Sequence, residues 1–382
     1  MTTAVPAADE LRRLMTERLV AEGALHSPAW QEAFAAVPRH AFVPEFTMRA
    51  RGSTFHYSRD DSSWMAAAYQ DVSLITQFDV TDTATSSSTA PTVMARMLEA
   101  SGAQDGDSIL EVGTGTGYNT ALLSHRLGSE HVVSVDVDPT LVNAARNRLQ
   151  AEGYTPTLIA ADGMAGHPER APYDRLLVTC GVDRLPDAWR EQVRPGGVIV
   201  AAVGFGIARL TVSTDHSAHG HFLPDLTAFM SARDTADTVR DTARQHFAML
   251  ATATGNTRTI SLPTNLDADG PAFLVSLAQP AVTQITLTDD AEQHLRCLYD
   301  PKSGSWARII QTDPRAAQLV HDGPRDLWAE RESLLTDWVT HGRPGLDRYG
   351  LTIDTTGAHT LWLDAPTGPS WRLAPAKPLT HP

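Results

Sequence analysis

The fold is decided by residues 109–123, which read ILEVGTGTGYNTALL. The apolar run that ends at Val112 predicts a short buried strand, and the residues after Gly117 predict the start of a helix. Between them, Gly113, Gly115 and Gly117 let the backbone pass close to a ligand, because a Cβ at these positions would collide with it or demand an unfavourable φ. Glu111 offers a carboxylate to the ammonium group of S-adenosylmethionine. The stretch therefore predicts a binding turn for this cofactor.

A related turn in dinucleotide-binding proteins follows a strand with the pattern Gly-x-Gly-x-x-Gly. Here the third glycine comes one residue early, at Gly117. Tyr118 takes the place of the last glycine of that pattern, which allows close packing of helix and strand beside a pyrophosphate. The spacing thus favours S-adenosylmethionine over a nicotinamide dinucleotide. A structural turn that binds no ligand remains an alternative.

Acidic residues close two later apolar runs, in the order that a doubly wound sheet requires. The second run, residues 131–136, ends in Asp136, which is placed to accept hydrogen bonds from two ribose hydroxyls. The third ends in Asp162, which we expect to face the adenine amino group. The fourth, residues 173–180, is almost wholly apolar, as a parallel strand covered on both faces should be. We therefore predict an α/β, Rossmann-like fold in which the cofactor contacts Glu111, Gly113, Thr114, Gly115, Gly117, Asp136, Val137, Asp162 and Gly163.

Several short motifs together resemble the protein-L-isoaspartate O-methyltransferase family. Besides the glycine turn they are PRHAFVP at residues 38–44, AYQD at 68–71, APYD at 171–174, Asp162-Gly163 and Gly196-Gly197. The resemblance covers about residues 10–233 and implies transfer of a methyl group from S-adenosylmethionine to a carboxylate in a peptide. It also implies that the residues around 51–82 border the substrate groove, so His56, Trp64 and Tyr69 are expected peptide contacts.

One segment departs from the family pattern and bears on the substrate. Repair enzymes of the family carry a segment like Gly-Gln-Thr-Ile-Ser-x-Pro, whose serine approaches the substrate carboxylate. This chain reads TATSSSTAP at residues 83–91. Counting back from Pro91 puts Thr89 at the serine position, so the resemblance implies that Thr89 orients the carboxylate, with Ser88 as second choice and Ser87 as a neighbouring contact. The alternative is a flexible polar loop that caps the helix starting at Pro91.

The chain continues well beyond this match, and the polar run at residues 233–237 is our expected boundary. It separates a catalytic domain, residues 1–233, from a smaller α+β domain, residues 240–382, which we expect to recognise a peptide. A helix from Pro324 to His341 is expected there, together with strands near residues 282–287, 306–310, 349–353 and 358–363. The extension resembles methyltransferases of ribosomally made peptides, including those paired with ATP-grasp ligases or found in lanthipeptide and lasso-peptide clusters. This implies methylation of an ordinary aspartate in a pre-crosslinked precursor, whose ester then closes to an aspartimide.

Composition restricts the partners and the location. The chain has 31 Lys and Arg against 45 Asp and Glu, a formal net charge of −14. A non-specific nucleic-acid binder needs a basic face, so we expect no nucleic-acid partner. No run approaches the roughly 18 apolar residues of a membrane helix, and the amino terminus lacks a signal peptide. Cys180 and Cys297 form no metal-type cluster. We expect a cytoplasmic protein without a metal or a membrane partner.

Four functions remain open at this point. The leading expectation is a peptide-maturation O-methyltransferase that acts on a precursor peptide beside an ATP-grasp ligase. The alternatives are a repair methyltransferase for isoaspartyl damage, a non-catalytic peptide-binding subunit that keeps the cofactor fold, and a nicotinamide oxidoreductase. Tyr118 and the Pro-Tyr-Asp segment argue against the oxidoreductase. The intact set of glycines and acids argues against the non-catalytic subunit, which has no need of them.

Overall fold

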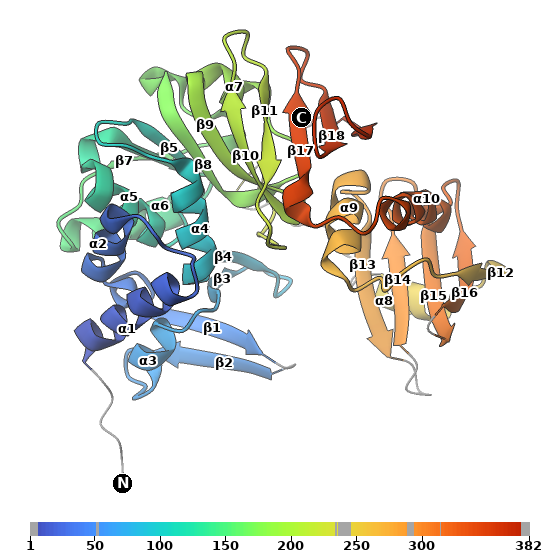
Figure 1. The fold of residues 1–382 in the computed structure, drawn as a ribbon. Coiled ribbons are helices and arrows are strands. Elements are labelled where there is room, and N and C mark those ends of the chain that lie inside the picture. Colours follow the sequence, from blue (N-terminus) through green and yellow to red (C-terminus); the bar gives the residue numbers. More distant parts are fainter. Residues whose placement is uncertain are drawn as a thin grey trace.

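A computed structural model of the chain describes residues 7–50, 53–233, 235, 246–288, 294–313 and 315–375. The expected boundary at residues 233–237 lies largely outside the described residues, because 234, 236 and 237 are not among them. Within the described part, the strands form three sheets (Figure 1). No helix of this part is both long enough and apolar enough to cross a bilayer.

The largest sheet has ten described strands, and its parallel half confirms the predicted fold class. From one edge the order is β7, β6, β5, β8, β9, β10, β11, β17, β18, β19. The chain leaves β5 first towards β6 and β7 and then crosses to β8 and β9, so the carboxyl ends of β5 and β8 mark the switch point where such sheets bind ligands. The parallel strands are β5 (Ile109–Val112), β6 (Val132–Asp136), β7 (Thr157–Ala160), β8 (Tyr173–Val182) and β9 (Val193–Val203). The antiparallel strands are β10 (Gly206–Val212), β11 (Ala218–Phe222), β17 (Tyr349–Ile353), β18 (His359–Leu363) and β19 (Ser370–Arg372).

Both faces of the parallel strands are buried, which explains their continuous apolar sequence. Neighbouring residues of one strand enter different cores: Ile109 packs with the helices on one face, and Leu110 packs with Trp189 on the other. The helices of this part are α1 (Ala8–Ala21), α2 (Pro28–Ala36), α3 (Trp64–Ala68), α4 (Pro91–Ser101), α5 (Tyr118–Leu127), α6 (Pro139–Ala151) and α7 (Asp187–Gln192). Short 3-10 turns are η1 (Arg39–Phe42), η2 (Ser129–His131), η3 (Gly163–Ala165), η4 (Pro168–Arg170) and η5 (Leu346–Arg348).

A small antiparallel sheet precedes α4 and carries the serine and threonine segment. Its strands are β1 (Glu45–Ala50), β2 (Ser53–Ser58), β3 (Leu74–Phe78) and β4 (Ala84–Ser88), in the order β2, β1, β3, β4. Residues 84–88 pair with β3, with Ser88 opposite Leu74. The flexible-loop alternative for these residues is therefore wrong, because ladder hydrogen bonds fix their backbone.

The carboxyl-terminal part contributes to two sheets rather than one. Its own sheet has the order β12, β16, β15, β14, β13, and three helices accompany it (Figure 1). The elements are α8 (Phe247–Thr252), β12 (Asn256–Ser261), α9 (Asp269–Ala278), β13 (Thr283–Thr288), β14 (His294–Tyr299), β15 (Trp306–Asp313), β16 (Ala316–Asp322) and α10 (Leu327–Thr340). Helix α10 begins later than the expected Pro324, because Asp326 caps it by accepting a hydrogen bond from the Ala329 amide at 3.0 Å.

The last three strands return to the large sheet. Strand β17 pairs antiparallel with β11, where Gly220 lies opposite Leu351, and β18 and β19 follow outward. The sequence-based division at residue 240 places these strands in the second domain, whereas their hydrogen bonds join them to the catalytic sheet. The expected strand positions themselves are confirmed within a residue or two at residues 349–353 and 358–363.

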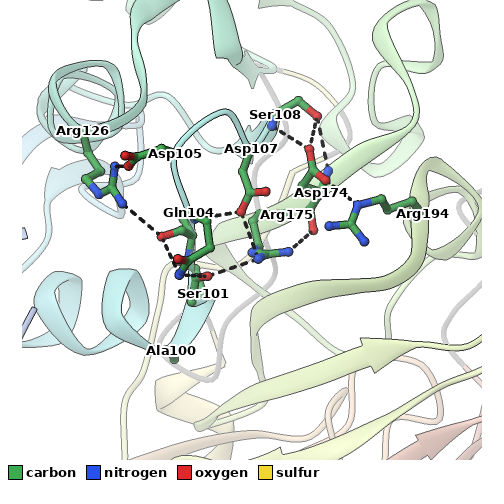
Figure 2. Close-up of polar contacts among 12 residues, drawn as sticks. Ala100, Ser101, Gln104, Asp105, Asp107, Ser108, Arg126, Asp174, Arg175 and Arg194 are labelled. Carbon is green, nitrogen blue, oxygen red and sulfur yellow. Dashed lines mark hydrogen bonds and ion pairs between the residues drawn. The ribbon is translucent and has the colours of Figure 1, made fainter. Parts of the chain in front are cut away.

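Polar contacts hold the amino ends of β5 and β8 together (Figure 2). Asp174 Oδ2 accepts hydrogen bonds from the amide and the hydroxyl of Ser108 at 2.8 and 3.0 Å, and Asp174 Oδ1 accepts one from Arg194. Arg175 forms an ion pair with Asp107 at 2.9 Å. Hydrogen bonds from Arg194 and Ser108 outweigh partial burial and lower the pKa of Asp174. The acid of the APYD motif thus holds structure at the end of the sheet away from the glycine turn.

Candidate active site

A cavity of about 430 Å³ opens at the carboxyl ends of β5, β6 and β8, at the switch point of the sheet. This volume lies within the usual range of small-ligand sites, about 300–1,000 Å³. The glycine turn, the ends of β6 and β7, strand β4 and residues 226–233 form its walls. The predicted residues that the structure brings together here are Ser87, Ser88, Thr89, Gly113, Thr114, Gly115, Asp136, Val137, Asp162 and Gly163.

The glycine turn has the backbone that its sequence requires. Gly113, Gly115 and Gly117 have φ values of 103°, 52° and 88°, in the region that side chains with a Cβ rarely adopt. Thr179 fixes the turn by donating its hydroxyl hydrogen to the Gly113 carbonyl at 2.8 Å. Gly117 does not line the cavity, contrary to the expectation: a Cβ there would lie 3.1 Å from the Cβ of Ala145. Its role is to let α6 approach closely.

Asp136 faces the cavity with a carboxylate that the backbone holds in place. Its side chain is buried, and Oδ2 accepts a hydrogen bond from the Gly115 amide at 2.8 Å while Oδ1 accepts one from the Asp138 amide at 3.1 Å. Burial raises the pKa of Asp136. Each oxygen keeps a lone pair, so the pair of oxygens fits two neighbouring ribose hydroxyls. Asp162 is held similarly, because its Oδ1 accepts a hydrogen bond from the Met164 amide at 2.9 Å. These residues fit the nucleoside part of S-adenosylmethionine.

Glu111 requires a correction. It is fully buried and does not line the cavity, so it is not placed to contact the ammonium group of a bound cofactor. Oε1 accepts a hydrogen bond from Asn119 at 2.6 Å, and Oε2 accepts hydrogen bonds from Thr120 at 2.5 Å and Ser134 at 2.6 Å. Burial raises the pKa of Glu111 to about 6 despite these hydrogen bonds. The carboxylate thus links β5 to β6 and α5 by hydrogen bonds. The sequence could not predict this structural role, because an acid at the end of a strand looks the same whether it binds a ligand or other residues of the chain.

The hydroxyls of the β4 segment differ in what they contact. Thr89 is half-buried at the cavity wall, and its hydroxyl makes no hydrogen bond to a described residue. Ser87 has the same exposure class. Ser88 lines the cavity but is only 3% exposed, and its Oγ accepts a hydrogen bond from Arg39 Nε at 3.4 Å. The geometry therefore favours Thr89 over Ser88 as the hydroxyl that a substrate can reach.

Arg39 is a residue to which the sequence analysis assigned no role. Its fully buried guanidinium donates hydrogen bonds to the carbonyls of Ser88 and Thr89 at 3.2 and 3.1 Å. It also donates to three carbonyls of the preceding segment, those of Ala68, Gln70 and Val72, at 2.8–3.0 Å. Burial lowers the pKa of Arg39 to about 10, which still leaves it charged at neutral pH. An arginine inside the largely apolar PRHAFVP motif was the available signal, since a buried charge needs partners.

None of the three expected peptide contacts from residues 51–82 lines the cavity. The predictions for Trp64 and Tyr69 are wrong, because both side chains are buried, whereas that for His56 stays a prediction. Trp64 is buried in the core, and its indole donates to the Val43 carbonyl at 3.0 Å. Tyr69 is also buried, with its hydroxyl 2.7 Å from Nδ1 of His40. His56 is exposed on β2, where Nδ1 lies 2.8 Å from the Thr47 hydroxyl. The two aromatic rings stabilise the core, which is the commoner place for such side chains.

Comparisons with known proteins identify the family of this chain. A family model described as Protein-L-isoaspartate(D-aspartate) O-methyltransferase (PCMT) matches residues 10–226. The chain belongs to this family. It is 35% identical over 197 residues to the protein-L-isoaspartate O-methyltransferase of Ignicoccus hospitalis, which covers 51% of this chain and 82% of the relative. It is also 35% identical over 198 residues to the enzyme of the same name from Methanosarcina mazei, covering 51% of this chain and 71% of the relative.

As a member of this family, the protein is a protein carboxyl O-methyltransferase, and its methyl donor is S-adenosylmethionine. A solved structure named protein-L-isoaspartate O-methyltransferase has a TM-score of 0.53 and 24% identity, and the match covers 93% of this chain and 100% of that chain. This likeness extends over most of the carboxyl-terminal part, beyond the residues of the family match. The fold of the extension thus does not by itself distinguish a peptide-maturation enzyme from others in the family.

Proposed function

We propose that this methyltransferase methylates the free carboxylate of L-isoaspartyl residues in polypeptides. The observation that carries the proposal is one cavity that holds both Asp136, suited to the cofactor's ribose, and the Thr89 hydroxyl, suited to a substrate carboxylate. The relatives from Ignicoccus hospitalis and Methanosarcina mazei carry this activity in their names.

The reaction asks for positioning rather than for acid or base catalysis. A carboxylate with a pKa near about 4 is already ionised and nucleophilic at neutral pH. S-adenosylmethionine, when bound, supplies an electrophilic methyl group on a sulfonium. The Thr89 hydroxyl donates a hydrogen bond to one substrate oxygen and leaves the other free to form the new O–C bond, as the methyl–sulfur bond of the donor breaks and its electron pair stays on the departing thioether. Most of the rate gain is then due to alignment, aided by exclusion of water, which strengthens the attraction between carboxylate and sulfonium.

A second candidate substrate is an ordinary aspartate in a ribosomally made, pre-crosslinked precursor peptide, with the ester closing to an aspartimide. The segment at residues 83–91 supports this candidate, because it lacks the Gly-Gln of the repair pattern and has Thr89 where that pattern has serine. The added β-methyl changes the shape of the wall that faces the substrate. An ATP-grasp ligase would then be the functional partner that makes the crosslinks.

Mass spectrometry on two substrates separates the candidates. The purified protein is incubated with S-adenosylmethionine and either a generic isoaspartyl peptide or a crosslinked precursor encoded near its gene, with the ordinary aspartyl version of the generic peptide as control. Efficient gain of about 14 Da on the isoaspartyl peptide alone supports the repair activity. Gain of about 14 Da followed by a net loss of about 18 Da on the precursor alone, as methanol leaves in an acyl transfer, supports the second candidate. Methylation of neither would contradict both.

A further inference from the structure

A second cavity, of about 630 Å³, lies where the large sheet meets the carboxyl-terminal part. The large sheet supplies residues 181–183 and 204–205, and the other walls come from α9, β13, β14 and α10. Figure 1 shows α9 and α10 at the top of the carboxyl-terminal sheet, on the side towards the large sheet. Phe273 of α9 contacts the large sheet directly: its ring packs edge-on against the ring of Phe222 of β11, with the two ring centroids 4.8 Å apart. The cavity thus exists only because the two parts pack together.

The second cavity adjoins the cofactor cavity. Phe229 and Ser231 line both of them. The segment between them is fixed to β8, since the Gly181 amide donates to the Met230 carbonyl at 2.7 Å and the Ala232 amide donates to the Gly181 carbonyl at 2.8 Å. One short stretch of backbone therefore forms part of the wall of both cavities.

The second cavity is lined by a buried cation without an acidic partner. Arg331 of α10 is only 5% exposed, and its guanidinium donates to the neutral side-chain oxygens of Gln279 at 2.6 Å and Gln284 at 2.8 Å. Among the described residues, no carboxylate forms an ion pair with Arg331, and no hydrogen bond involves its Nη2. The neighbouring Glu330 favours the charge of Arg331 but is itself paired with Arg325 at 2.6 Å. Burial lowers the pKa of Arg331 to about 9, so it is charged at neutral pH. Buried charges are normally paired, because leaving water is costly.

The second cavity is also lined by other charged groups and by an aromatic ring. Arg296 is already compensated by Asp267 at 2.6 Å, and Asp183 lies on the wall formed by the large sheet. Phe205, 42% exposed, presents an aromatic ring at the wall, and its amide is fixed by a hydrogen bond to Ser276 at 2.8 Å. In a chain of net charge −14, this cavity keeps one buried positive charge available beside an exposed ring.

We propose that the second cavity binds a carboxylate-bearing stretch of the same polypeptide whose methyl acceptor lies in the first cavity, with Arg331 as the contact for that carboxylate. The inference rests on the proposed function and names a substrate preference: acidic side chains flanking the acceptor. A guanidinium and a carboxylate form short, charge-assisted hydrogen bonds. The shared wall at Phe229 and Ser231 is what joins this site to the reacting carboxylate.

Fluorescence anisotropy on the full chain tests the site without methyl transfer. The probes are a labelled peptide of alternating glutamate and glycine and its glutamine-containing counterpart. We expect the wild type to bind the glutamate peptide about 10-fold more tightly, the gain from one charge-assisted hydrogen-bonded contact. Arg331→Gln should abolish this difference. Arg258→Gln should retain it, because Arg258 lies in the same part of the chain but lines neither cavity.

Two further measurements make the outcome decisive. The glutamate peptide should compete with an isoaspartyl peptide in the methylation assay and raise the apparent KM for the isoaspartyl peptide. Binding of the glutamate peptide without such competition would overturn the claim that one polypeptide occupies both cavities. Equal affinity of the wild type for both probes, or an unchanged preference in Arg331→Gln, would overturn the site itself. If Arg331→Gln does not fold, Arg331→Lys, which keeps the charge, should retain the preference, and its loss would contradict the proposal. Absence of isoaspartyl methylation with an intact binding preference would count against the proposed function alone.

Discussion

The two ends of the parallel sheet use acidic residues in opposite ways. At the carboxyl end, Asp136 is the last residue of β6, accepts hydrogen bonds from two backbone amides and faces the cofactor cavity. At the amino end, Asp174 of β8 accepts hydrogen bonds from Ser108 and Arg194 and lines neither of the two cavities described above (Figure 2). In the sequence, Asp136 closes an apolar run and Asp174 belongs to the APYD motif. The comparison indicates that an acid is available to a ligand where it lies at the carboxyl end of the sheet and also faces the cavity. Glu111 lies at the same end but faces the interior, and it holds the fold instead.

The strongest test of this difference is Asp136→Ala. Two hydrogen bonds to a charged acceptor are lost from the ribose, each worth about 1.5–3 kcal/mol, so the affinity for S-adenosylmethionine should fall at least about 100-fold. Isothermal titration calorimetry measures this. The matched control is Asp174→Asn, which should bind the cofactor like the wild type. Equal losses in the two variants would show that the contrast between the two ends is wrong.

The next largest effect is expected at the substrate wall of the same cavity. Thr89→Val removes the hydroxyl that orients the carboxylate and should lower kcat by about 10- to 100-fold, the cost of one charged hydrogen bond. Cofactor affinity should not change. Thr89→Ser keeps the hydroxyl and should keep most of the activity in a radiolabelled methyl-transfer assay. Full activity in Thr89→Val would remove Thr89 from the site.

Glu111 sharpens the comparison, since it lies on β5 beside the cavity but faces the interior. Its folded-state pKa of about 6 is above the ordinary glutamate value of about 4.3, so its contribution to stability is fully present below pH 4.3 and is lost as the pH rises through 6. Glu111→Gln should therefore become more stable relative to the wild type between pH 4 and pH 7, by up to about 2 kcal/mol. Urea unfolding at several pH values measures this. A large loss of cofactor affinity in this variant would restore Glu111 as a cofactor contact.

The smallest expected effect is at the amino end. Asp174→Asn should reduce the free energy of unfolding by about 1 kcal/mol at pH 7, because Arg194 is partly exposed and solvent screens the pair. The folded-state pKa of Asp174 is lowered, so this stabilisation is present above the ordinary aspartate pKa of about 3.9 and disappears as the pH falls through the folded value. Thermal unfolding of the wild type and the variant at pH 7 and pH 3 checks whether the stability difference between them shrinks as the pH falls. An equal difference at both pH values would contradict the assignment.

Local sequence patterns were enough to predict the parallel strands of the large sheet and most of the predicted cofactor residues that line the first cavity. Apolar runs of strand length, acids at their ends and glycines at alternate positions depend on neighbours within a few residues, so they are readable along the chain. The same local patterns could not tell Glu111 from Asp136, because both close an apolar run. The direction in which each carboxylate points depends on partners supplied by other elements, such as Asn119 and Ser134 for Glu111.

The sequence by itself therefore determined the fold class and the cofactor turn, since both rest on short-range periodicity and on backbone conformations that particular residues permit. Its short motifs carried the resemblance to the family, which the family model then matched. Only the tertiary structure decided that Arg39 holds the β4 segment, that β17–β19 extend the catalytic sheet, and that Arg331 is buried beside a second cavity. These features join residues that are tens to more than a hundred positions apart, and the packing that brings them together leaves no period in the sequence.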